Sequence, residues 1–90
     1  MATDLERARA ALRRAGAPDA NTLAYSTRAG KRFMWRNPET GRLTHFGSAS
    51  RNTHLDAPDE KKRRAYVARH APGGFPRYTP AWLALKVLWT

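Results

Sequence analysis

The amino-acid sequence predicts an α+β fold: a small three-stranded antiparallel sheet with a basic helix, an apolar C-terminal helix and an N-terminal helical extension. Helix-start residues precede three segments, near the beginning, the middle and the end of the chain. Between the first two, residues 22–46 contain apolar and aromatic segments separated by turn residues, as strands do. A chain of 90 residues has room for about one hydrophobic core. We therefore expect a single domain at residues 21–90, preceded by the extension at residues 1–20.

The first predicted helix begins with a capping box. Thr3 is followed three residues later by Glu6, so each side chain can bind a free backbone amide of the other. The helix should run from Asp4 to Ala15 and end at Gly16. Its apolar stripe consists mostly of alanines, which bury little area. We therefore expect this helix to be held loosely, or to become ordered only on a partner.

The central segment predicts a three-stranded meander. Its candidate strands read TLAYST, KRFMWR and RLTHF, and the sequence from Asn37 through Pro38 to Gly41 joins the last two as a hairpin. Alternation in KRFMWR places Phe33 and Trp35 on an apolar face.

The other face of that strand carries positive charge. Arg32 and Arg36 lie on it with Met34, which makes both arginines candidate contacts for a polyanion. Trp35 should lie in the core, opposite Leu43 or His45 of the next strand.

The second predicted helix covers about residues 58–70, with Asp56 as its N-cap. It carries the run Lys61-Lys-Arg-Arg64, whose members point around the whole circumference. A helical wheel places Arg63 beside Tyr66, where its stem can lie along the core. The remaining basic side chains form one outer face, made of Lys61, Lys62, Arg64 and Arg69. This face is either a solvated surface or a polyanion-binding one.

The third predicted helix, residues 80–89, follows the pair Thr79-Pro80. Only Lys86 is charged in it, so apolar side chains cover almost its whole circumference. A helix that is apolar all round is usually buried on all sides. A domain this small has difficulty providing that cover, so we expect a homodimer or another protein to contact the group Trp82, Leu85 and Trp89.

The amino-acid composition indicates the class of binding partner and gives no sign of a catalytic site. Seventeen Lys and Arg against seven Asp and Glu give a net charge of +10, which favours polyanions as partners. There are no cysteines, and His45, His54 and His70 lack metal-ligand spacing, so we expect no metal site, no cofactor and no enzymatic activity. No apolar segment is long enough to span a membrane, and no apolar signal segment begins the chain, so we expect neither a span nor secretion.

A series of short motifs resembles a known family. Thr44-His-Phe-Gly47, the segment from Asp56 to Arg64, Tyr66-x-x-Arg69-His70 and a closing Leu88-Trp89 occur in that order. Over residues 31–90 the chain resembles small basic proteins of large nucleocytoplasmic DNA viruses of algae and protists. The resemblance implies a viral setting and no established catalytic activity. It also implies a shared structural or binding function for Tyr66, Arg69 and His70.

These observations lead to a functional hypothesis. We expect a non-enzymatic virion or nucleoprotein component that binds nucleic acid, DNA rather than RNA, through phosphate contacts. Its location would be the virion or the nucleus or cytoplasm of the host. The alternative is a minor capsid or cement protein that makes protein–protein contacts in the virion shell. The candidate phosphate contacts are Lys61, Lys62, Arg64, Arg69, Arg32 and Arg36.

Overall fold

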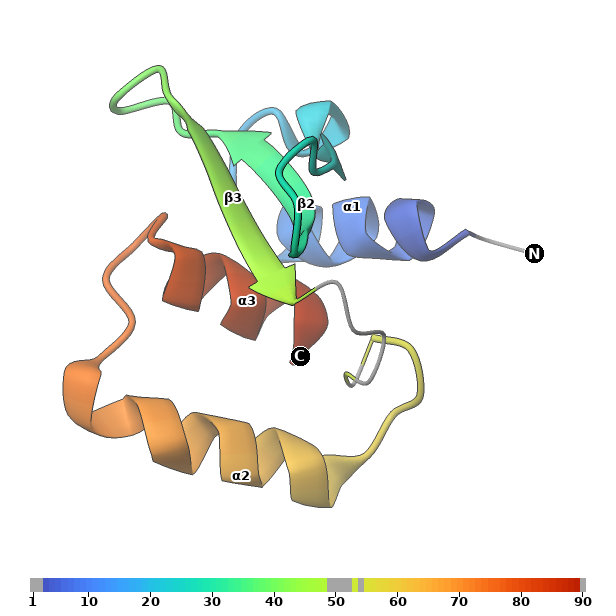
Figure 1. The fold of residues 1–90 in the computed structure, drawn as a ribbon, viewed down its shortest axis with the longest axis vertical. Helices are drawn as coiled ribbons and strands as arrows, with labels where there is room; N and C mark the ends of the chain where they lie inside the picture. The colour runs from blue at the N-terminus through green and yellow to red at the C-terminus, as the bar shows by residue number, and fades with distance from the viewer. Residues whose placement is uncertain (1–2, 49–52, 54, 90) are drawn as a thin grey trace.

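The computed structural model describes residues 3–48, 53 and 55–89 and has the predicted α+β fold. Three helices and one three-stranded antiparallel sheet make up the fold, with strand order β1-β2-β3 (Figure 1). Two 3₁₀ turns, η1 and η2, join some of these elements. The elements in chain order are α1 (Asp4–Arg14), η1 (Ala20–Thr22), β1 (Ala24–Tyr25), β2 (Lys31–Arg36), β3 (Leu43–Ser48), α2 (Glu60–His70), η2 (Ala71–Gly73) and α3 (Pro80–Leu88).

Helix α1 begins as predicted but is not a loosely held extension. The capping box of Thr3 and Glu6 is present, with both reciprocal hydrogen bonds. Ala8 and Leu12 are fully buried and belong to the same core cluster as the sheet and α3. The small alanine side chains allow a close approach to the neighbouring elements, so a stripe of low area still packs well. Residues 1–20 are therefore not separate from the core of residues 21–90.

The sheet forms the predicted hairpin with a different register. Phe33 and Trp35 are fully buried, as expected. Phe33 pairs with Phe46 across the hairpin, whereas Trp35 pairs with Thr44 and not with Leu43 or His45. The core around them is completed by fully or almost fully buried aliphatic side chains, Leu12, Leu23, Leu83, Val87 and Leu88.

Helix α2 is the outermost element and lies on the side of α3 that faces away from the sheet (Figure 1). It begins later than predicted, because its N-cap is Asp59, which accepts hydrogen bonds from the amides of Lys61 and Lys62. Asp56, the predicted N-cap, is used in an ion pair described below. Tyr66 is the one buried residue of this helix, so a single aromatic ring anchors α2 to the rest of the protein.

Helix α3 begins as predicted, with the Thr79 side chain accepting from the amide of Trp82. The group Trp82, Leu85 and Trp89, expected to contact a partner, is partly buried against its own chain. Trp82 meets Tyr78 edge to face at 5.3 Å, and Trp89 stacks on Tyr66 at 4.8 Å between ring centroids. Leu85 is also partly buried against the core. The segment after η2 and helix α2 thus cover part of this apolar group.

Candidate nucleic-acid interface

The basic face of α2 consists of Lys61, Lys62, Arg64 and Arg69, and all four residues are exposed. Tyr66 is turned toward the core, and the helical period places Lys61 and Arg64 on the side opposite it. Lys62 and Arg69 lie four residues before and three residues after Tyr66, so they flank the inward side. Arg63 lies between the two sides, with 36% of its side chain exposed against 78% for Arg64. The four residues are therefore exposed as predicted, but they spread over a wide arc of the helix.

Acidic residues are fewer than basic ones in α2. Glu60 is the one acidic residue within α2, and its carboxylate lies 3.4 Å from Arg63 and 3.7 Å from Arg64. Ion pairs between exposed side chains are weak, so they do not tie the arginines firmly. Asp59 contributes its carboxylate to the N-cap of the helix. Helix α2 thus carries five Lys and Arg residues against one acidic residue.

Arg32 is not part of a binding surface, and its prediction as a phosphate contact is wrong. Its side chain is 4% exposed and forms a bidentate pair with Asp56, at 2.6 and 2.8 Å. Asp4 from α1 adds a second carboxylate at 3.4 Å, and the Thr53 hydroxyl lies 3.3 Å away. The Asp56 and Asp4 carboxylates neutralise the buried Arg32 guanidinium. Arg32 is therefore not available to bind the phosphate of a nucleic acid.

This ion pair changes the acidity of its members. Burial of the Asp56 carboxyl opposes its ionisation, but hydrogen bonds from Arg32 and Thr53 and the charge of Arg32 outweigh burial and lower the pKa to about 2. Burial likewise opposes the charge of Arg32, and the hydrogen bonds and charges of Asp56 and Asp4 outweigh it, so that its pKa is raised. Arg32 thus joins the start of α1, strand β2 and the turn before α2.

Arg36 is exposed, as predicted, but lies apart from the basic face. Its guanidinium donates to the Gly41 carbonyl and so braces the turn of the β2–β3 hairpin. That hairpin lies at the end of the sheet remote from α2 (Figure 1). The structure therefore does not bring Arg36 together with the basic face of α2.

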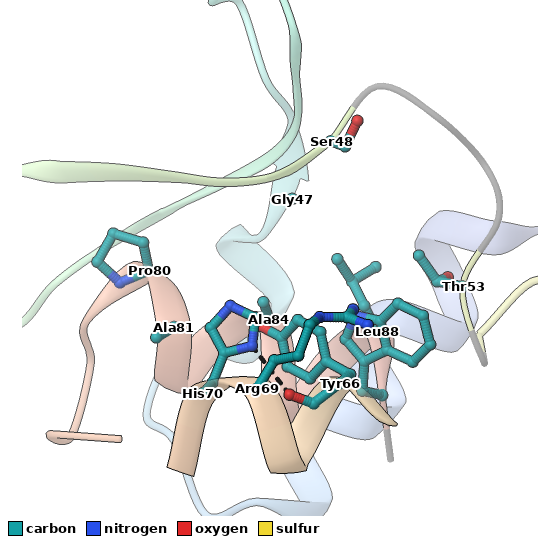
Figure 2. Close-up of a pocket in the computed structure, with 11 residues that line it drawn as sticks. Gly47, Ser48, Thr53, Tyr66, Arg69, His70, Pro80, Ala81, Ala84 and Leu88 are labelled. Atoms are coloured by element: carbon teal, nitrogen blue, oxygen red, sulfur yellow. Dashed lines mark hydrogen bonds between the residues drawn. The ribbon is translucent and has the colours of Figure 1, made fainter. Parts of the chain in front are cut away.

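A cavity of about 440 Å³ lies where α2, α3 and the end of β3 meet. Figure 2 shows Arg69 and His70 on the α2 side, Pro80 and Ala81 at the start of α3, and Gly47 and Ser48 above them. The remaining lining residues are Thr53, Tyr66, Ala84, Leu88 and Trp89.

A stack of aromatic rings forms one side of this cavity. Trp89 lies against one face of Tyr66, with an interplanar angle of 10°, and His70 lies 4.2 Å from the Tyr66 ring centroid. The His70 Nδ1 lies 2.9 Å from the Tyr66 carbonyl oxygen (Figure 2). Since a carbonyl only accepts, Nδ1 is the donor of this contact, and Nε2 takes no part in it.

Tyr66, Arg69 and His70, singled out by the viral resemblance, all line this one cavity. Burial of the Tyr66 hydroxyl raises its pKa, against the opposing effect of the Arg69 charge, so the phenol stays neutral. Arg69 is exposed and belongs to both the cavity and the basic face of α2. The opposite wall, with Ser48, was missed, because its proximity to α2 depends on tertiary packing.

Sequence reasoning also missed a contact between Ser26 and His45. Ser26 Oγ lies 2.7 Å from His45 Nδ1, across 19 positions of sequence. Ser26 Oγ also accepts from the Arg28 amide at 3.0 Å, which is the geometry of a serine-stabilised turn. Neither residue lines the cavity beside α2. We interpret the pair as a brace for the β1–β2 turn.

Metal-ligating side chains do not gather in the part of the chain that the structure describes, where no group of three or more His, Asp or Glu is found. His54 lies outside the described residues. Among these same residues, none of the helices has the length and apolar character needed to cross a membrane.

Comparison with known proteins identifies a family. Residues 22–70, which extend from β1 through the end of α2, match a family of unknown function, DUF5754. Because the match covers more than half of the chain, the protein belongs to this family. No curated protein and no solved structure matches the chain significantly.

Proposed function

We propose that this member of the DUF5754 family is a non-enzymatic nucleic-acid-binding protein that contacts phosphates through the basic face of α2. The observation that carries the proposal is the exposure of Lys61, Lys62, Arg64 and Arg69 together on the outermost helix. Four exposed cations on one helix suit the closely spaced phosphates of a nucleic-acid backbone.

Binding of this kind depends little on sequence. Lysine and arginine contacts to phosphates fix the position of a protein on a duplex without reading base edges. The net charge of +10 supports rapid association with any polyanion at low salt. DNA is the proposed partner, in keeping with the resemblance to proteins of DNA viruses over residues 31–90. The viral setting, in the virion or in the infected cell, is part of the same proposal and rests on that resemblance.

A contact surface in the virion shell is less well supported. That alternative relied on Trp82, Leu85 and Trp89 as an exposed apolar group, and these side chains pack against their own chain. Among the described residues, the large apolar side chains that are exposed are Tyr25 and Leu43, which lie on different strands.

The test is a binding titration with matched charge. A basic-face variant, with alanine at residues 61, 62, 64 and 69, has a net charge of +6 instead of +10. A control variant, with alanine at the exposed residues 13, 14, 28 and 42, has the same net charge. We expect the basic-face variant to bind a 20-base-pair duplex at least about tenfold more weakly than the control. Equal affinities of the two folded variants would reject the proposed interface.

A further inference from the structure

We propose that the cavity between α2, α3 and the end of β3 takes one unpaired nucleobase of a single-stranded nucleic acid. This inference rests on the proposed function and extends it, because it assigns a ligand to a site that shares Arg69 with the basic face. The cavity volume of about 440 Å³ lies within the range of small-molecule sites, roughly 300–1,000 Å³.

The position of Arg69 connects the cavity to the phosphate-binding face. Arg69 is exposed on the basic face and also lines the cavity. A phosphate held at Arg69 therefore places the base attached to it beside the cavity mouth. His70, the next residue, stands at the same rim (Figure 2). The Arg69 guanidinium gives the mouth a positive character that complements a nucleotide.

The walls have the chemistry that a base requires. Ala84, Leu88 and the Trp89 ring give apolar surface, and aromatic rings are the usual stacking partners of unpaired bases. Polar groups are few: the Arg69 guanidinium and the His70 Nε2, which takes no part in the Nδ1 contact. A mostly apolar pocket with a few polar groups is the common form of a small-ligand site.

The occupant must be unpaired. A base inside a duplex is stacked on both faces and cannot enter a pocket unless it is turned out of the helix. The cavity should therefore contribute to the binding of single strands and leave the binding of an intact duplex to the basic face. This difference separates the two proposals experimentally.

The test is a substitution that fills the cavity, with a matched control. Ala81→Leu places a larger side chain at the cavity wall on α3, where the native residue is half-buried. Ala10→Leu makes the same change at a half-buried position of α1, which contributes no residue to the cavity. We expect Ala81→Leu to weaken binding of an eight-residue thymidine oligonucleotide about tenfold, and Ala10→Leu to leave it unchanged. Duplex binding should stay the same in both variants.

Each outcome distinguishes the two proposals. If Ala81→Leu binds the single strand as well as the wild type does, the cavity proposal is wrong, and the basic face is judged by duplex binding alone. If Ala81→Leu does not fold, nuclear magnetic resonance of the wild-type protein decides. Addition of the same oligonucleotide should then shift the amide signals of Gly47, Ala81 and Trp89. Shifts confined to the exposed side of α2 would overturn the cavity proposal.

Discussion

The Arg32 guanidinium binds both carboxylate oxygens of Asp56, at 2.6 and 2.8 Å, and thereby ties strand β2 to the turn that precedes α2. Asp4 adds a contact at 3.4 Å from the first turn of α1. Thr53 donates to the same Asp56 carboxylate through its hydroxyl at 2.7 Å and through its amide at 3.1 Å. An arginine that the sequence places on a charged surface is thus part of the buried structure.

The Asp56 ion pair predicts a loss of stability in acid. The Asp56 pKa is lowered from 3.8 to about 2, so its carboxylate stabilises the fold above pH 4, and this contribution disappears as the pH falls toward 2. A difference of this size corresponds to about 2 kcal/mol. Urea unfolding at pH 6 and pH 2 should show it. An Asp56→Asn variant should lose less stability between these two pH values than the wild type, and an equal loss in both proteins would contradict the assignment.

Replacing Arg32 tests the same ion-pair cluster through its cationic member. Arg32→Met should lower the free energy of unfolding by about 3 kcal/mol, because it leaves two partly buried carboxylates without their partner. Arg36→Met, at an exposed position of the same strand, should change it by less than about 0.5 kcal/mol. Thermal unfolding measures both. Similar effects of the two substitutions would show that Arg32 is not held as described.

Gly47 is predicted to be sensitive to a single methyl group. Its φ is +79°, and a Cβ at this position would lie 2.8 Å from Leu88 Cδ1 and 3.3 Å from Arg32 Cβ. Gly47→Ala therefore combines backbone strain with crowding of a buried leucine, and should destabilise the protein by about 2–3 kcal/mol. Gly41 has a similar φ of +73° with no atom within 4 Å of its Cβ position, so Gly41→Ala should cost about 1 kcal/mol. Chemical denaturation of both variants gives the two changes in the free energy of unfolding. Equal decreases for Gly47→Ala and Gly41→Ala would contradict the crowding at Gly47.

The free protein is predicted to be a monomer. Trp82, Leu85 and Trp89 are packed against their own chain, so a dimer through them would bury little additional apolar area. Sedimentation velocity at physiological salt should give one monomeric species at micromolar concentration. A concentration-dependent dimer that Leu85→Lys disrupts would instead restore this group as a protein interface.

Local signals were sufficient to predict most elements. The capping box at Thr3, the hairpin turn ending at Gly41 and the Thr79-Pro80 helix start depend on neighbouring residues alone, and each is present in the structure. The exposure of Lys61 and Arg64 also follows from helical periodicity, because Tyr66 lies on the opposite side of α2 and is buried.

Long-range contacts explain the differences. Asp56 is a suitable N-cap by local rules, but its pairing with Arg32 spans 24 positions and leaves the cap to Asp59. The cover of Trp89 by Tyr66 likewise depends on the path of the chain between α2 and α3. The cavity wall at Gly47 could not be predicted either, since no local pattern places the end of β3 opposite α2.

The central claim, that the basic face of α2 binds the nucleic-acid backbone, is tested most directly by the salt dependence of duplex binding. For the wild type, the logarithm of the association constant should fall steeply and linearly with the logarithm of the salt concentration. With alanine at residues 61, 62, 64 and 69, the slope should decrease in magnitude by about 3–4, since about one counterion is released at each phosphate contact. The control variant of equal charge, with alanine at residues 13, 14, 28 and 42, should keep the wild-type slope. Identical slopes for the wild type and the basic-face variant would contradict the claim.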